Sequence, residues 1–357
     1  MKMNKLPLAI LSDILSRVSS QSLLRFRCVC KRWREAIDDS YFRNSLHCSK
    51  ERVLLHHEYG KEEIYISEIQ EEAAMKMILI GKFPELKGYM LQGACNGFLL
   101  FGHWTDIENN PELLINPLAK EILRLPRVSD LLPNMSAIKL VCGFGFDRSA
   151  NTYKMVQISE IDYDEETHTR TTGARVCNFK KQLWRTCKAP PPSQWLCSKS
   201  VFACGALNWL IDKRVKATLS FDLTSEEFSL IPIPISDDSY GATGMHEVGE
   251  SLALFLYRIS NTTHLETWVL KDATSTRREW TIKYRIDTVG KFYYVLGPYE
   301  LEKLILHRWG DTCLYDVNKQ RFTRCGTEDM ALHRCRSVTL SLVSLEQLFG
   351  EETSGRL

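Results

Sequence analysis

The chain has 357 residues, 44% of them hydrophobic and 25% charged, which is the composition of an ordinary globular protein and excludes a disordered or fibrous chain. Its 46 basic and 44 acidic residues leave a formal net charge of +2, so charge alone favours neither nucleic acid nor an anionic membrane as a partner. No run approaches the roughly 18 consecutive apolar residues of a membrane span, and no secretory signal precedes the 12 cysteines, so we expect free thiols and a cytoplasmic and/or nuclear location.

The first fifty residues predict a small, basic, helical unit. They hold ten basic and four acidic residues, a net charge of +6, so the other 307 residues carry −4. From Leu8 to Val18 the apolar residues recur at intervals of three and four, which places them on one face of a helix that follows Pro7. A second helical segment is expected after Ser19 or Ser20, whose hydroxyls can cap it.

This unit has too few residues to bury enough surface on its own. Its remaining apolar surface is therefore covered either by the rest of the chain or by a partner helix that docks in a groove. The pattern alone leaves both alternatives open.

Six motifs in the unit match a known module in residue type and spacing: Leu6-Pro7, Ile10-Leu11, Ile14-Leu15, Arg17-Val18, residues 22–26 and residues 29–34. Residues 5–45 therefore resemble an F-box, although Ser19 stands where the family commonly has proline. The resemblance implies a three-helix F-box domain at residues 1–46 that binds a Skp-family adaptor and, through it, a cullin in a ubiquitin ligase. The adaptor contacts that it implies are Leu6, Pro7, Ile10, Leu11, Leu15, Leu23, Leu24, Val29, Cys30 and Trp33.

Beyond residue 50 the sequence changes to short apolar runs bounded by Gly, Asn, Asp and Pro, which is typical of short antiparallel strands. Residues 114–126, 221–232 and 314–322 repeat the order of a strand, a polar turn that starts with Asn or Asp, and a second strand. With three weaker copies, the repeats have anchors near residues 65, 115, 177, 221, 269 and 315. A period near 45 to 50 residues favours four-stranded propeller blades. We therefore predict an all-β propeller of about six kelch-like blades at residues 47–357, with seven blades as the alternative.

Three glycine-rich runs, 93–100, 203–210 and 249–255, precede several anchors and are assigned to inner strands, where glycine permits close backbone approach. The final apolar run, Ser337 to Leu345, is expected to pair with the first blade and close the ring. Four tryptophans at repeat or strand positions are expected in the blade cores: Trp184, Trp209, Trp268 and Trp280.

A second resemblance rests on the motifs of this region, among them Asn116-Pro117, residues 143–147, residues 205–210 and residues 268–272. In this order after an F-box, they are similar to the F-box associated domain of plant F-box proteins, a class that includes immune-receptor regulators and the S-locus F-box group. The resemblance implies a kelch-like β-propeller whose motifs are mainly scaffold.

The sequence predicts no catalytic site, metal site or cofactor. The pairs Cys28 with Cys30 and His333 with Cys335 lack the second pair that a structural zinc site needs. No nucleophile elbow occurs, and the glycines near residues 143 and 241 lack the residues of a phosphate loop. The acidic residues 162–166 are interpreted as a solvated loop. The basic run Arg25 to Arg34 lies on an amphipathic helix, so we expect it to complement an acidic adaptor rather than bind nucleic acid.

Aromatic side chains in loop-like stretches are candidate contacts for a target protein, because propeller loops carry binding residues and aromatic anchors dominate interfaces. These candidates are Trp104, Trp195, Tyr240 and His246. The predicted function is the substrate-recognition subunit of a Skp-cullin-F-box ubiquitin ligase, which holds an unknown substrate protein for ubiquitination and degradation. Two alternatives stay open: a non-degradative binding module that uses the adaptor only for stability, and a propeller enzyme that acts on a small molecule in the axial channel.

Overall fold

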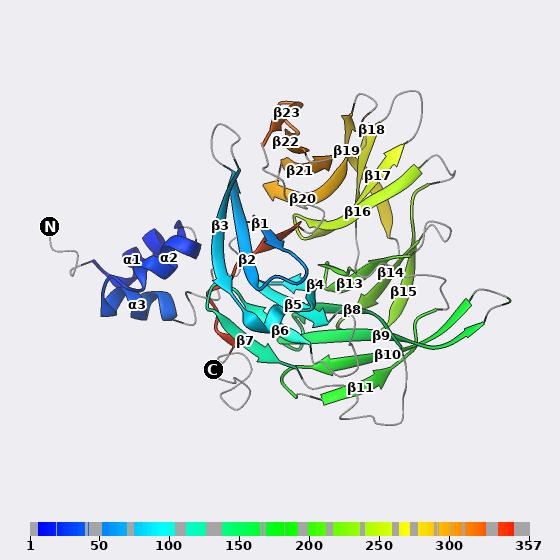
Figure 1. The fold of residues 1–357 in the computed structure, drawn as a ribbon, viewed down its shortest axis with the longest axis horizontal. Helices are drawn as coiled ribbons and strands as arrows, with labels where there is room; N and C mark the ends of the chain where they lie inside the picture. The colour runs from blue at the N-terminus through cyan, green and yellow to red at the C-terminus, as the bar shows by residue number, and fades with distance from the viewer. Residues whose placement is uncertain are drawn as a thin grey trace.

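The computed structural model describes the backbone of most of the chain, within the ranges 6–18, 20–39, 42, 52–69, 75–103, 112–125, 138–164, 166, 169–181, 183–191, 199–211, 217–235, 240–258, 264–271, 278–288, 291, 293–300, 302–308, 311–325 and 335–345. Six four-stranded sheets surround a common axis, and three helices lie beside them (Figure 1). The sheets confirm the predicted propeller and fix its blade number at six. None of the helices in these ranges has the length and apolar character needed to cross a membrane.

The N-terminal unit contains α1 (Leu8–Ser16), α2 (Ser20–Phe26) and α3 (Lys31–Asp38). Helix α1 begins directly after Pro7, whose carbonyl accepts a 3.0 Å hydrogen bond from the amide of Leu11. The second predicted segment divides into α2 and α3 because Cys30 is extended, with φ −162° and ψ 164°. The unit therefore has the three helices that the resemblance implies, and we call it the helical module.

Each blade has four antiparallel strands, which follow one another from the axis outward. Blade 1 contains β24 (Cys335–Thr339), β1 (Arg52–His57), β2 (Glu63–Ile69) and β3 (Met75–Lys82); blade 2 contains β4 (Tyr89–Cys95), β5 (Phe98–His103), β6 (Leu113–Asn116) and β7 (Glu121–Arg124); blade 3 contains β8 (Ile138–Asp147), β9 (Thr152–Asp164), β10 (Thr169–Asn178) and β11 (Leu183–Cys187). Blade 4 contains β12 (Val201–Ala203), β13 (Ala206–Leu210), β14 (Ala217–Asp222) and β15 (Phe228–Pro232); blade 5 contains β16 (Tyr240–Val248), β17 (Ser251–Arg258), β18 (His264–Lys271) and β19 (Glu279–Asp287); blade 6 contains β20 (Tyr294–Glu300), β21 (Lys303–Arg308), β22 (Asp311–Asp316) and β23 (Arg321–Arg324). A short 3-10 helix, η2 (Pro84–Leu86), joins blade 1 to blade 2.

The six predicted anchors all fall in the third strand of a blade, and the repeated Asn or Asp ends that strand. In blade 2 the side-chain Oδ1 of Asn116 accepts hydrogen bonds from the amides of Leu118 and Ala119, at 3.1 and 3.2 Å. In blade 4 the Oδ1 of Asp222 accepts equivalent bonds from the amides two and three residues later, at 2.9 and 2.7 Å. The motif recurs because such a side chain can stand in for a backbone carbonyl and hold the turn into the outer strand.

The glycine-rich runs require a correction, because a glycine of each run lies in the hairpin turn that follows an inner strand. Asn96 and Gly97 have φ values of 49° and 83°, and Cys204 and Gly205 have 53° and 73°. Two successive positive φ angles are typical of a type I′ hairpin, which favours glycine for conformational reasons and not for close approach at the axis. Close approach does occur elsewhere, at Gly143 of β8, where a Cβ atom would lie 2.7 Å from the ring of Trp209.

The last strand closes the ring as predicted, because β24 pairs with β1 through partners such as Val338 with Val53. Residues 340–345, which we call the C-terminal clamp, then continue to blade 2. There the carboxylate of Glu121 accepts hydrogen bonds from the hydroxyl of Ser344 at 2.8 Å and from the amide of Leu345 at 2.5 Å. The C-terminal clamp therefore joins blade 1 to blade 2 and ties the first and last parts of the ring together.

Apolar side chains fill the space between neighbouring blades. Trp209 is fully buried among residues of blades 3 and 4, and Trp184 is buried between blades 2 and 3. Trp268 and Trp280 are half-buried and pack on the core between blades 4 and 5. All four predicted tryptophans therefore contribute to the blade cores, two of them only in part.

The helical module packs on the propeller through a small apolar cluster. Its members are Leu11, Leu15, Leu23, Ala36, Ile37 and Phe42 of the N-terminal region together with Leu118 and Leu342 of the propeller. Leu342 belongs to the C-terminal clamp, so the module packs on a surface that exists only when the ring is closed. The rest of the chain thus covers part of the module, as one of the two alternatives predicted.

Candidate protein-binding surfaces

Three of the ten predicted adaptor residues lie inside the helical module. Leu11, Leu15 and Leu23 are 2%, 0% and 0% exposed and pack against Ile37 and Phe42. These side chains hold the helices together, so they position a surface and do not form it. The side chain of Leu24 lies outside the described residues.

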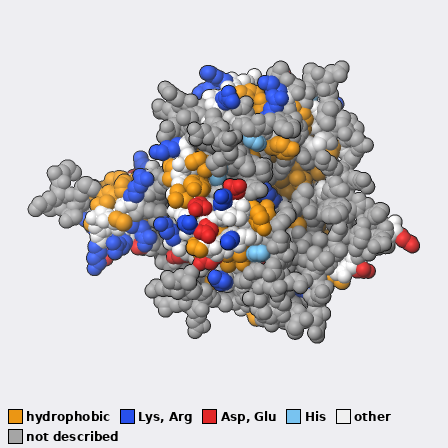
Figure 2. All heavy atoms as spheres, viewed as in Figure 1, with side chains coloured by type: hydrophobic (Ala, Val, Ile, Leu, Met, Phe, Trp, Pro, Cys, Tyr) orange, Lys and Arg blue, Asp and Glu red, His pale blue; other side chains and the backbone are white. Residues whose placement is uncertain are grey.

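Three other members of the predicted set, Pro7, Ile10 and Val29, are exposed to solvent. Ile10 is 48% exposed and Val29 59%, which is unusual for large apolar side chains. Ile14, which the prediction did not include, is 45% exposed and lies one turn after Ile10 on the same face of α1. Figure 2 shows hydrophobic side chains gathered on this module together with Lys and Arg. We call Ile10, Ile14 and Val29 the exposed apolar set.

The remaining predicted residues, Leu6, Cys30 and Trp33, are half-buried. The ring of Trp33 meets that of Phe26 edge to face, with centroids 5.1 Å apart, and so joins α3 to α2. The carbonyl of Leu6 accepts a hydrogen bond from the guanidinium of Arg32, which ties the residue before α1 to α3. These contacts fix the relative position of the three helices.

The basic residues of the module divide into two groups. Arg27 forms an ion pair with Asp38 at 2.8 Å, and Arg34 donates a 3.3 Å hydrogen bond to the carbonyl of Arg27. These arginines connect α2 and α3 and are part of the module's own structure. Arg25 and Lys31, like Arg34, are exposed, and the pair that Lys31 forms with Glu35 is long, at 3.8 Å, so the charges of Arg25 and Lys31 face solvent.

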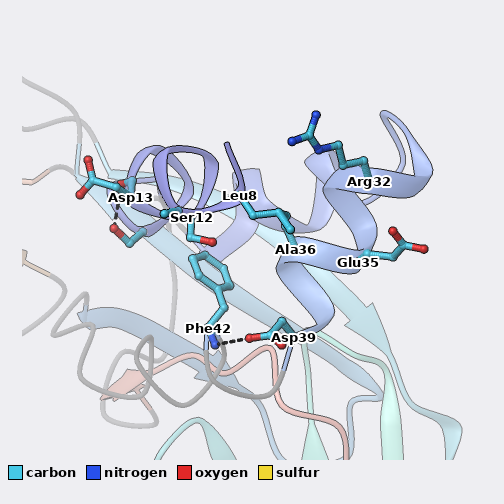
Figure 3. Close-up of a pocket in the computed structure, with 10 residues that line it drawn as sticks. Leu8, Ser12, Asp13, Arg32, Glu35, Ala36, Asp39 and Phe42 are labelled. Carbon is cyan, nitrogen blue, oxygen red and sulfur yellow. Dashed lines mark hydrogen bonds between the residues drawn. The ribbon is translucent and has the colours of Figure 1, made fainter. Parts of the chain in front are cut away.

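A groove of about 880 Å³ lies between α1 and α3. It is lined by Leu8, Ala9, Ser12, Asp13, Ser16, Arg32, Glu35, Ala36, Asp39 and Phe42. Figure 3 shows the ring of Phe42 directed toward Ser12, while its amide donates a 3.0 Å hydrogen bond to the carboxylate of Asp39. Because successive residues of an α-helix turn by 100°, Ser12 and Ser16 lie on the side of α1 opposite Ile10 and Ile14. The groove and the exposed apolar set are therefore separate surfaces.

The two ends of the propeller differ in the length of their connections. The inner strands all run in the same direction, because the chain passes from the outer strand of each blade to the inner strand of the next. Where the inner strands end, most connections are tight turns such as 96–97, 117–120 and 204–205, and 272–278 is a longer one. Where the inner strands begin, the connections include 104–112, 188–200 and 233–239. We call these the short-turn end and the long-connection end.

Three of the four predicted target contacts belong to segments at the long-connection end, and His246 is the exception. Trp104 and Trp195 belong to its connections but lie outside the described residues, and Tyr240 begins β16 with a side chain that is also outside them. His246 was expected in a loop, and this is corrected: it lies within β16, where its Nε2 donates a 3.0 Å hydrogen bond to the carbonyl of Val295. Burial lowers the pKa of His246 to about 3, so its ring is neutral.

The acidic run and the Cys and His pairs considered as metal ligands do not form a metal site within the described residues. Asp162 lies near the end of β9, so the acidic run extends a strand and is not wholly a loop, and this residue is exposed. His333 and the side chain of Cys335 lie outside the described residues. Within the ranges that are described, no three side chains of His, Cys, Asp or Glu come together in a way that could hold a metal ion.

Comparison with known families gives two matches. The F-box associated beta propeller domain matches residues 57–308, and the F-box domain matches residues 3–45. The first match covers blades 2 to 5 in full and parts of blades 1 and 6, and the second covers the helical module.

Three relatives from Arabidopsis thaliana illustrate the similarity. An F-box/kelch-repeat protein is 26% identical over 261 residues, which cover 65% of this chain and 66% of the relative. An F-box/LRR-repeat protein is 25% identical over 294 residues, 78% of this chain and 66% of the relative, and an F-box protein is 25% identical over 313 residues, 80% and 73%. The chain spans just under two thirds of the length of the first two. Among solved structures, an oligogalacturonate lyase in complex with manganese covers 78% of this chain and 80% of its own at 8% identity, with a TM-score of 0.49.

Proposed function

The chain belongs to the family of F-box proteins that carry an F-box associated β-propeller domain, and on that premise we propose that it is the substrate-recognition subunit of a Skp-cullin-F-box ubiquitin ligase. An F-box implies binding of a Skp-family adaptor in general. The proposal adds that the adaptor links this chain to a cullin, that the propeller holds a target protein for ubiquitination and degradation, and that this takes place in the cytoplasm or nucleus.

One observation carries the proposal: the helical module has a filled core and still exposes Ile10, Ile14 and Val29. An apolar side chain of this size gains roughly 1.5 to 3 kcal/mol when it is fully buried. The module's own core does not supply that burial, and neither does the described part of the propeller. A partner that covers these side chains does, and the exposed Arg25 and Lys31 favour a partner that is acidic.

The position of the module relative to the propeller also supports the proposal. The module packs on Leu118 and Leu342, which belong to the short-turn end. The long connections, which include the segments of Trp104 and Trp195, leave from the opposite end. An adaptor and a target can therefore be held at different places on one rigid ring. Holding a target beside a ligase raises its effective concentration, so the chain needs no catalytic group of its own.

The test is adaptor binding by the double variant Ile10→Glu with Val29→Glu, measured by pull-down of a purified Skp-family adaptor. We expect binding to fall at least tenfold, because two charged side chains would be desolvated in the interface. The matched control is Leu183→Glu on β11, an apolar residue of the propeller that is also 59% exposed, and its adaptor binding should be unchanged. Undiminished binding by the double variant would refute the interface. Leu23→Asp is unsuitable for this test, because a buried charge would unfold the module.

Degradation is tested separately, by target abundance in cells. Proteins that co-purify with both the wild-type chain and the double variant are candidate targets, because they do not depend on the adaptor. Under the proposal, their abundance rises when the double variant replaces the wild-type chain or when the proteasome is inhibited. Abundance that responds to neither change would favour a non-degradative binding module.

A further inference from the structure

A charged side chain reaches the axis of the propeller from blade 1. Arg336 lies on the inner strand β24, and its guanidinium donates hydrogen bonds to the carbonyl of Gln92 on β4, at 3.4 Å, and to the carbonyl of Ser200, directly before β12. These three residues belong to blades 1, 2 and 4, and blade 3 separates the last two. A group that contacts all three blades must lie in the central channel.

The charge of Arg336 is not balanced by a carboxylate within the described part of the chain. Both groups that its guanidinium contacts there are backbone carbonyls. The carboxylate of Glu247, on the inner strand β16, is paired with Arg52 of β1 at 2.5 Å, which joins blade 5 to blade 1. Burial lowers the pKa of Arg336 to about 10, so the guanidinium is still protonated at neutral pH.

The guanidinium of Arg336 also retains unused N–H donors and surface that a ligand can reach. A guanidinium has five N–H donors, and the two carbonyls engage two of them. The side chain lies deep enough for burial to shift its pKa, yet it is only half-buried. A side chain that is surrounded by protein and still has accessible surface lines an internal channel.

We propose that the axial channel is a carboxylate-binding site with Arg336 as its cationic anchor. A carboxylate fits because its two oxygens match the planar fork of a guanidinium. It fits better than a phosphate, because the carbonyls of Gln92, Ser200 and Val295 already direct negative ends toward this region and would repel a second negative charge. The neutral ring of His246, bonded to Val295, adds no competing charge.

The ligand enters from the long-connection end. Arg336 is the second residue of the short strand β24 and Ser200 precedes the short strand β12, but Gln92, which Arg336 contacts, lies in the middle of β4. The guanidinium therefore lies partway along the channel. Lys199, which is exposed, stands beside Ser200 and attracts anions to this end. Nearer the short-turn end, the pair of Arg52 and Glu247 joins blade 1 to blade 5. A carboxylate at Arg336 is therefore reached from the end at which the proposed function places the target.

The test measures binding to the purified full-length chain by calorimetry. The probes are acetyl-Ala-Glu-Ala-amide, its Gln counterpart and sodium propionate. We expect the Glu peptide to bind at least tenfold more tightly than the Gln peptide, and Arg336→Gln to remove that preference. Arg321→Gln, which changes an exposed arginine of β23, should keep the preference for the Glu peptide.

If propionate binds as tightly as the Glu peptide, the site takes a free carboxylic acid. If the Glu peptide binds more tightly than propionate, the site takes an acidic polypeptide segment. Equal binding of the two peptides, or binding of none of the probes, overturns the proposal.

A second measurement uses the wild-type protein, so its result does not depend on whether the Arg336 variant folds. In wild-type protein with ¹⁵N-labelled arginine side chains, the Nε–Hε resonance of Arg336, identified by its absence in Arg336→Lys, should shift on addition of the Glu peptide and not of the Gln peptide. An unmoved resonance speaks against the site. The outcome is independent of the adaptor: Ile10→Glu with Val29→Glu should keep peptide binding, and Arg336→Gln should keep adaptor binding, so failure of one proposal is distinguishable from failure of the other.

Discussion

The side-chain amide of Asn116 donates a 2.6 Å hydrogen bond to the carbonyl of Val343, which lies 227 residues further along the chain. The Oδ1 of the same fully buried side chain holds the turn that follows β6. Asn116 therefore combines the turn function that its counterparts serve in other blades with a contact to the C-terminal clamp. Asp at this position would serve the turn but could not donate to Val343.

Asn116→Asp should accordingly lower the free energy of unfolding by about 2 to 4 kcal/mol, because it replaces a donor by a buried acceptor that faces a carbonyl. Chemical denaturation of the full-length chain measures this. Asn178→Asp is the control: the Oδ1 of Asn178 accepts bonds from Thr152 and Lys180, so a carboxylate preserves the turn. Its effect should stay within about 0.5 kcal/mol. Equal effects of the two substitutions would contradict the role of the clamp.

Gly97 offers an independent test of the clamp. Gly97 and Gly205 occupy equivalent hairpin turns, with φ values of 83° and 73°. Alanine at either position would have to adopt a left-handed backbone conformation, which lowers the free energy of unfolding by about 1 kcal/mol. A Cβ atom on Gly97 would also overlap the backbone of Leu340 and Ser341, whereas Gly205 has no atom within 4 Å of that position.

Gly97→Ala should therefore destabilise the propeller by about 1 to 3 kcal/mol more than Gly205→Ala, because the clamp must move away from blade 2. The difference between the two thermal unfolding midpoints is the measurement. A result in which both variants lose the same stability would show that only the backbone conformation matters and that the clamp is loosely held.

The blade number could be predicted from sequence because its signal is local. Asn116, Asp222 and Asp316 each accept hydrogen bonds from amides two or three residues later, so the pattern recurs wherever a third strand turns into a fourth. The turn glycines of the glycine-rich runs were placed in the wrong element for a related reason. Gly97 is required by a turn and Gly143 by the neighbouring Trp209, and the sequence does not distinguish these two needs.

The candidate surfaces could be predicted only in part. Leu11 and Ile10 are adjacent, apolar and on one helix, and which of them faces inward depends on where α3 and Phe42 pack. Arg336 gave no sequence signal, because Gln92 and Ser200 come near it only after blades 1, 2 and 4 have assembled. Burial of a helix face and contacts across a ring are properties of the tertiary structure.

Leu23→Ala tests the assignment of Leu23 to the module's core. The side chain is fully buried, so its truncation should destabilise the module by about 2 to 5 kcal/mol. Amide hydrogen exchange should become faster in α1, α2 and α3 while the strands of blades 3 to 5 keep their protection. Exposed Ile14, changed to Ala, should leave exchange in the module unchanged. Identical exchange in the two variants would mean that Leu23 is not a core residue.

Lys154 is the centre of a buried ionic network between blades 3 and 4. Its ammonium lies 2.8 Å from the carboxylates of both Asp147 and Glu226 and donates a 2.6 Å hydrogen bond to the carbonyl of Leu223. Burial would raise the pKa of Asp147, but hydrogen bonds from Lys154 and Ser149 outweigh it and lower the pKa from 3.8 to about 2. The ionised carboxylate is therefore a stabilising partner in the folded state.

Lys154→Met should lower the free energy of unfolding by about 3 to 5 kcal/mol at pH 7, because it leaves two carboxylates without their buried cation.

The pH dependence of this stability has a defined sign. A carboxyl whose pKa is lowered on folding contributes stability that is fully present above pH 3.8 and is lost as pH falls toward about 2. Wild-type protein should lose this contribution across that interval, and Lys154→Met should lose less, because Asp147 then lacks its main partner. Urea denaturation at several pH values measures both slopes. The control is Lys319→Met: the lysine side chain is 77% exposed and its ammonium lies 3.7 Å from the carboxylate of Asp316, so the effect should stay within about 0.5 kcal/mol at every pH. Parallel slopes for Lys154→Met and wild type would exclude Lys154 as the cause of the lowered pKa of Asp147.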